Sequence, residues 1–174
     1  MSGALPPFLD LAQAARRELS LTGRLAVTSM PRLASALASD GGDADVGLQA
    51  ARDLSGRVVI SGHIDARLEM TCQRCLGGVT VAVHAEPRLA WVKSDAELEA
   101  LPSEYEPLLS ADGRVAVAEL VADELLLALP LVPKHGEGEA CEVDQAVTVH
   151  AAPAAAEESR KNPFAELAKL KRGR

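Results

Sequence analysis

Large aromatic side chains are almost absent from this 174-residue sequence, which contains one tryptophan, one tyrosine and two phenylalanines. Because 48% of the residues are nonetheless hydrophobic, we expect a globular core packed mainly by valine, leucine, isoleucine and alanine. The sequence also lacks an apolar run of the roughly 18 residues that a membrane-spanning helix needs. Its first residues lack the basic start and apolar stretch of a secretory signal, so we expect a cytoplasmic protein without membrane contact.

Motifs of the common enzyme classes are missing as well. The sequence has no glycine-rich loop that could cradle a phosphate and no serine, histidine and aspartate pattern that would indicate a nucleophile. His63 and His84 fall on the polar sides of predicted strands, where a solvated side chain is more common than a catalytic base. We therefore expect no catalytic residue, no small-molecule substrate and no enzymatic activity.

Negative charge predominates, but it is unevenly distributed. The chain has a net charge of −7, yet residues 1–158 carry 12 basic and 24 acidic side chains, whereas residues 159–174 carry six and one. An acidic body repels phosphate, so wrapping of a nucleic-acid duplex around it is not expected. If the protein contacts RNA directly, the basic C-terminal tail is the expected place.

Alternation of apolar and polar residues predicts a long β-hairpin. Residues 57–71 alternate with the period of two that is typical of a half-buried strand. The alternation resumes over residues 79–85, so the two runs are expected to pair in antiparallel fashion with residues 72–78 at the tip. Gly62 interrupts the first run and predicts a bulge.

Other elements are predicted around this hairpin. We expect a first strand near Leu19 and helices over residues 30–38 and 118–129, the second of which ends before Pro130. Residues 94–112 contain two prolines and predict a long connecting loop. The expected fold class is α+β, with an antiparallel sheet, a long central hairpin and a packed helix.

The acidic residues of the second predicted helix are assigned to its solvated side. A hard cation could bind them in principle, but a solvated helix face explains them more readily. These residues are Glu119, Asp123 and Glu124.

The predicted domain plan has three parts. A single domain covers residues 1–150, a flexible linker rich in alanine, proline and glutamate covers residues 151–161, and a short amphipathic helix covers residues 162–174. Asn162 and Pro163 supply an N-cap and a proline at the first helical position. Apolar anchors surrounded by basic residues suit docking on an RNA-rich partner, although a frayed solubilising tail is an equally simple interpretation. The candidate partner-binding residues are Arg160, Lys161, Phe164, Leu167, Lys169, Leu170, Lys171, Arg172 and Arg174.

The three cysteines and one histidine form the strongest candidate site. Cys72 and Cys75 lie at Cys-x-x-Cys spacing on the predicted hairpin tip, and His135 and Cys141 follow on a later loop. Three sulfurs and one imidazole nitrogen are natural ligands for a tetrahedral zinc ion, and four protein ligands close the site, which favours a structural metal over a catalytic one. Two alternatives are cysteines and a histidine that never meet, and a redox-active pair of Cys72 and Cys75.

Four segments together resemble a known family. They are MTCQRC at residues 70–75, EALPSEYEP at 99–107, DELLLALPLVPKH at 123–135 followed by Cys141, and NPFAELAKLK at 162–171. In this order they resemble the large ribosomal RNA subunit accumulation protein family, also called the YceD family. The family's cysteine pair corresponds to Cys72 and Cys75, and its later histidine and cysteine correspond to His135 and Cys141.

This resemblance implies a non-enzymatic bacterial factor in ribosome biogenesis. It would support the synthesis, processing or stability of large-subunit (23S) ribosomal RNA. The implied partner is a large-subunit ribosomal RNA precursor or a pre-ribosomal particle, contacted directly or through ribosomal proteins. Two other functions remain open, namely an RNA-modifying or RNA-cleaving enzyme and a zinc-stabilised adaptor that binds protein in transcription or translation.

Overall fold

A computed structural model describes residues 4–136 and residue 141 of the chain. All of them lie within residues 1–143, which form one compact unit. The predicted linker over residues 151–161 and the predicted helix over residues 162–174 lie outside the described residues.

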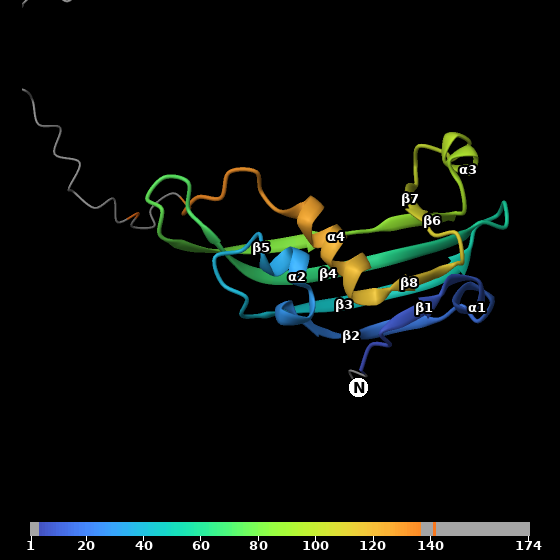
Figure 1. Cartoon of the computed structure of the whole chain (residues 1–174), viewed down its shortest axis with the longest axis horizontal. Helices are drawn as coiled ribbons and strands as arrows, with labels where there is room; N and C mark the ends of the chain where they lie inside the picture. The colour runs from blue at the N-terminus through green and yellow to red at the C-terminus, as the bar shows by residue number, and fades with distance from the viewer. Residues whose placement is uncertain (1–3, 137–140, 142–174) are drawn as a thin grey trace, which may run out of the picture. The chain divides into compact units, whose positions relative to one another are not determined.

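A six-stranded sheet forms the centre of the described part of the chain (Figure 1). Its strands follow the order β2-β3-β4-β6-β7, and β5 also pairs with β4. All pairs are antiparallel except β6 with β7, which is parallel. The strands are β2 (Ser20–Ala26), β3 (Asp43–Arg52), β4 (Val58–Thr71), β5 (Gly78–Ala85), β6 (Arg88–Val92) and β7 (Glu106–Leu109).

The 14-residue strand β4 organises the sheet. It pairs along one side with β3, while β5 and then β6 pair in succession with its other side. Pro87 lies between β5 and β6, and its lack of an N–H interrupts the pairing at that point. The pairing of β4 with β5 confirms the predicted hairpin, because Thr71 lies opposite Gly78.

The predicted bulge at Gly62 is wrong. The register between β3 and β4 runs unbroken from Ala44 opposite Ala66 to Arg52 opposite Val58. A Cβ atom at Gly62 would instead collide with the carbonyl oxygen of Gly47 on β3. Glycine is therefore required at position 62 because the two backbones approach closely, not because a residue is inserted.

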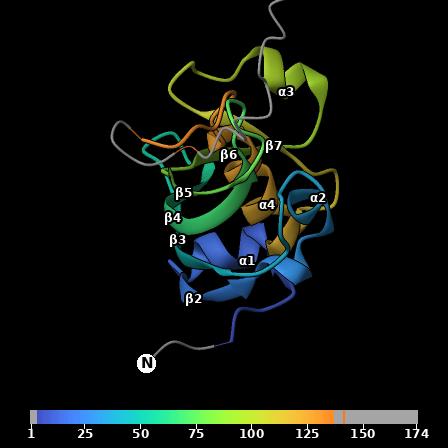
Figure 2. The same cartoon turned by 90° about the vertical axis from the view of Figure 1, so that its left-hand side faces the viewer.

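The helices cover one side of the curved sheet, as Figure 2 shows for α1, α2 and α4. Helix α4 (Val117–Ala128) contacts β4 and β5, and α1 (Leu11–Arg16) contacts β3 and β4. The Asp10 carboxylate caps α1 by accepting a 2.7 Å hydrogen bond from the Gln13 N–H. The remaining elements are η1 (Val27–Ser29), α2 (Pro31–Ala34), α3 (Asp95–Glu99) and a two-stranded pair of β1 (Phe8–Asp10) with β8 (Arg114–Ala116).

The core lies between these helices and the sheet. Ile60, Ile64 and Leu68 of β4 are almost completely buried against it, as are Val121 and Leu125 of α4. From His63 to Thr71 the alternate β4 residues are exposed, whereas Val59 near the start of the strand is buried. The predicted α+β fold and the period-of-two pattern of β4 are therefore confirmed.

Three other expectations need correction. Only Pro31–Ala34 of the predicted helix over residues 30–38 is α-helical. The predicted loop over residues 94–112 contains helix α3 and strand β7. Strand β7 forms despite Pro107, because its residues pair in parallel with β6 at the edge of the sheet. Glu124 does not lie on the solvated face of its helix as expected, because it is only 8% exposed and lines a groove between α4 and the strands β6 and β7.

Candidate metal centre

The hairpin tip places the first two cysteines. Beyond Thr71 the chain turns so that the Cys72 N–H donates to the Gly77 carbonyl at 2.8 Å and the Leu76 N–H donates to the Cys72 carbonyl at 2.9 Å. Leu76 adopts a φ of 62°, which allows this tight return into β5. The Arg74 N–H lies 3.4 Å from the Cys72 sulfur. The turn therefore directs backbone N–H groups toward a sulfur atom and holds Cys72 and Cys75 on one loop.

A second loop, which follows α4, brings the histidine to the same place. Leu129 leaves the helix in an extended conformation, as expected before a proline. The chain then crosses to the hairpin tip, where the Pro133 carbonyl accepts a 2.8 Å hydrogen bond from the Gln73 N–H. Two segments about sixty residues apart are joined at this point, at one end of the sheet (Figure 1).

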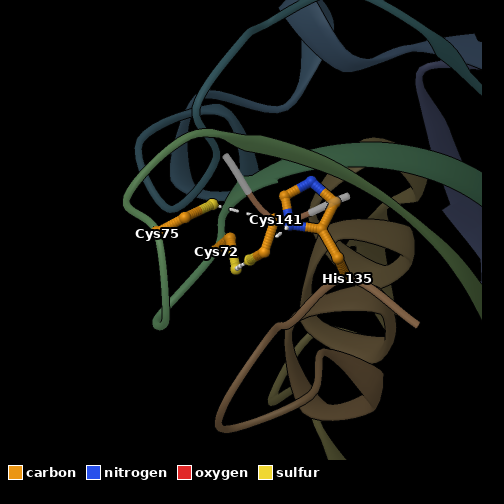
Figure 3. Close-up of side chains that lie close together, drawn as sticks. All are labelled: Cys72, Cys75, His135 and Cys141. Carbon is orange, nitrogen blue, oxygen red and sulfur yellow. Dashed lines mark hydrogen bonds between the residues drawn. The ribbon is translucent and has the colours of Figure 1, made fainter. Parts of the chain in front are cut away.

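The four predicted ligands lie together (Figure 3). The Cys72 and Cys141 sulfurs are 3.7 Å apart, and His135 Nδ1 lies 3.6 Å from the Cys75 sulfur and 3.3 Å from the Cys141 sulfur. All four ligand atoms are within 4.8 Å of one another. With zinc–sulfur bonds of about 2.3 Å, tetrahedral geometry places sulfurs about 3.8 Å apart. The group could therefore hold a metal ion, and its spacing fits a tetrahedral one.

The other nitrogen of His135 orients the ring. Nε2 lies 3.0 Å from the carbonyl oxygen of Gly78, the first residue of β5. A carbonyl can only accept, so Nε2 carries the proton and donates it. In the neutral imidazole this leaves the Nδ1 lone pair directed at the sulfurs, as in the metal sites of proteins where a second hydrogen bond fixes the histidine tautomer.

The surroundings of the cysteines favour thiolates at two of the three positions. Burial opposes the charged form of Cys72, but the N–H groups of Cys75, Arg74 and His135 outweigh it and lower its pKa to about 5. Burial likewise opposes the Cys141 thiolate, but the Arg74 side chain, whose Nε lies 3.0 Å from that sulfur, lowers its pKa. The Cys75 pKa is raised despite the Gly77 N–H, because Cys141 and burial disfavour a further negative charge.

Arg74 is a residue of this site that sequence reasoning missed. It lies between the two cysteines of the Cys-x-x-Cys motif, and its guanidinium contacts the third cysteine. A cation inside the motif was the signal that could have identified it. Beneath the site, Met70, Cys72 and Val79 form a small apolar cluster of their own, separate from the main core.

The other residues considered from the sequence lie elsewhere. His84 is exposed and contacts Asp65 at 2.7 Å and Glu86 at 3.3 Å, and His63 is exposed on the neighbouring strand. The candidate partner-binding residues of the tail, from Arg160 to Arg174, lie outside the described residues. In the described ranges, no helix has both the length and the apolar character needed to cross a membrane.

Comparison with known proteins gives a family match and several curated relatives. The family profile of the large ribosomal RNA subunit accumulation protein YceD matches residues 60–171. A protein of Haemophilus influenzae named large ribosomal RNA subunit accumulation protein YceD is 33% identical over 168 residues, which cover 96% of each chain. The matched region contains both loops of the candidate metal centre. No solved structure matches the chain.

Proposed function

Because the chain belongs to the large ribosomal RNA subunit accumulation protein YceD family, we propose that it is a non-enzymatic factor that supports the synthesis, processing or stability of 23S ribosomal RNA. Family membership over almost the whole chain is the observation that carries this proposal. The proposed site of action is the cytoplasm, on a large-subunit ribosomal RNA precursor or pre-ribosomal particle.

The proposed cofactor is one structural zinc ion. Three sulfurs and one nitrogen are ligands that zinc prefers, and the distances between them suit tetrahedral coordination. Four protein ligands would leave no open position for water, so a zinc ion there would fasten the hairpin tip to the loop after α4. Such a zinc ion would stabilise the fold and would not activate water for hydrolysis.

The proposed partner contact is the basic C-terminal segment. The body is acidic, so the six basic residues after residue 158 are the natural place for contact with RNA phosphates. Phe164, Leu167 and Leu170 would provide apolar anchors on the same particle.

Depletion of the protein tests this function. The ratio of 23S to 16S ribosomal RNA should fall on depletion and return with the intact chain. An unchanged ratio, together with unchanged precursor processing, would contradict the proposal. Crosslinking of protein to RNA in cells separates direct RNA contact from the second candidate, a zinc-stabilised adaptor, which the acidic charge of the body favours. An adaptor would crosslink to proteins and not to ribosomal RNA.

A further inference from the structure

A groove of about 300 Å³ runs between α4 and the strands β6 and β7. Its apolar lining includes Leu89, Leu108 and Leu120, and its polar lining consists of the carboxylates of Glu106, Asp123 and Glu124. No basic side chain lines it. The groove therefore combines an apolar wall with side chains that carry only negative charge.

Glu124 is the unusual member of this group. It is 8% exposed, and no hydrogen bond or ion pair joins its carboxylate to another described residue. Because none of the described residues has a fully buried side-chain oxygen without a partner, the carboxylate oxygens of Glu124 reach the groove. Asp123, its neighbour in sequence, is paired with Arg32 at the surface. Burial raises the pKa of Glu124, and the nearby charges of Glu106 and Asp123 raise it further. No described basic side chain is paired with this carboxylate, so its charged form is disfavoured.

A bare metal ion does not fit the groove. Among the described residues, the only group of three or more potential metal ligands whose atoms converge is the Cys/His cluster at the hairpin tip. The three carboxylates are therefore too widely spaced to share a hard cation. Nucleic acid does not fit either, because its phosphates would meet the same negative charge.

A long basic side chain fits both features of the groove. The methylene stem of a lysine or arginine packs well on leucine side chains, while the charged end forms a strong hydrogen bond with a carboxylate. We propose that this groove binds a lysine or arginine side chain from a basic, partly apolar segment of a partner protein. Leu127 lies at the groove and is 76% exposed, so it provides an apolar contact for the residues that flank the bound cation.

Charge complementarity supports a basic polypeptide as the partner. Residues 1–158 carry twice as many acidic as basic side chains, so the body as a whole attracts a cationic chain. This inference does not depend on zinc or on the C-terminal segment, and its test is separate from the test of ribosomal RNA accumulation.

The test is the binding of a labelled amphipathic peptide of leucine and lysine to the full chain, measured by fluorescence polarisation at several salt concentrations. Glu124→Gln should weaken binding about tenfold or more, because a charged hydrogen bond is lost. Glu119→Gln removes the same charge from an exposed position on the same helix and should change the affinity less than about twofold. Carbodiimide coupling followed by mass spectrometry should place the peptide's lysine on Glu124, Asp123 or Glu106.

Several results would overturn the proposal. Equal losses in the two variants would mean that the peptide responds only to overall charge. Absence of measurable binding, or coupling spread evenly over the surface carboxylates, would also contradict the proposal. A large gain in affinity on removing residues 160–174 would identify the chain's own basic segment as the occupant, and a concentration-dependent dimer lost in Glu124→Gln would identify a second copy.

Discussion

Cys72 combines complete burial with a lowered pKa, and its environment explains both. Three backbone N–H groups approach its sulfur, so the thiolate is stabilised by fixed dipoles in an apolar surrounding. A metal ligand must be a thiolate, and a preformed one binds metal with less competition from protons. Three thiolates around a zinc ion would leave one excess negative charge, which Arg74 is placed to balance.

The first residue-scale prediction concerns zinc. Purified, reduced protein should contain about one zinc per chain by metal analysis. Cys72→Ser should abolish this zinc and lower the thermal midpoint, since metal binding is coupled to folding. Gln73→Ser, which changes the neighbouring residue without removing a ligand, should retain the metal. Zinc absent from carefully prepared wild-type protein would refute the site.

The second residue-scale prediction concerns Glu124 and pH. Its pKa is raised in the folded state, so the folded state binds this proton more tightly than the unfolded chain does. Protonation of Glu124 therefore contributes to the free energy of unfolding. This contribution is fully present below the unfolded pKa of about 4.3 and is lost as the pH rises through the folded pKa. Glu124→Gln should therefore raise the thermal midpoint near neutral pH, because the substituted side chain carries no charge there.

Thermal melts across the pH range check this expectation. The gain in Glu124→Gln should shrink below about pH 4, where the wild-type carboxyl is protonated as well. Glu119→Gln, at an exposed position of the same helix, should show little gain at any pH. A gain that is independent of pH would show that the effect does not come from ionisation of Glu124.

At the scale of elements, β4 connects the two ends of the described unit. Its first half pairs with β6, and its second half continues as the hairpin that carries Cys72 and Cys75. Helix α4 packs across β4 and β5, and its C-terminal end leads directly to the loop with His135. Packing of α4 on the sheet therefore also sets the position of the second half of the metal centre.

Two leucines of α4 test this packing. Leu125 is completely buried, so Leu125→Ala should lower the free energy of unfolding by about 2–5 kcal/mol. Leu127 is two residues away and 76% exposed, so Leu127→Ala should change it by less than about 0.5 kcal/mol. Urea denaturation of both variants measures the difference. Similar losses in the two would mean that α4 is not seated as described.

At the scale of the whole molecule, charge divides the chain. The acidic region ends near residue 158 and a short basic segment follows. Salt should weaken contacts between RNA and the basic segment, and it should also weaken contacts between basic proteins and the acidic region. The salt dependence of RNA binding and the salt dependence of binding to a basic protein can be measured separately.

Deletion of residues 160–174 tests this division. The body should stay folded, since its core lies within the described residues, while association with large-subunit precursor particles should weaken and depend less on salt, because six basic residues are lost. Sedimentation with precursor particles at several salt concentrations measures both effects. A variant with glutamine at Lys169, Lys171, Arg172 and Arg174 separates the charge from the apolar anchors. Unchanged sedimentation of the truncated chain would mean that the segment only aids solubility.

Local pattern was sufficient for the central elements of this protein. The period of two fixed the β4–β5 hairpin, and Pro130 fixed the end of α4, because both depend on residues close together in sequence. Residue type was sufficient to select the four candidate ligands, since cysteine and histidine are rare in this chain and chemically distinct.

Contacts between distant segments decided the rest. Gly62 is required by the backbone of β3, and the pairing of β7 with β6 is parallel and therefore not carried by a local turn. Glu124 lines a groove that exists only where α4 approaches those two strands. The distances among Cys72, Cys75, His135 and Cys141 likewise depend on a loop that crosses from α4 to the hairpin tip. Such features follow from which surfaces meet when the chain packs, and periodicity along the chain does not record them.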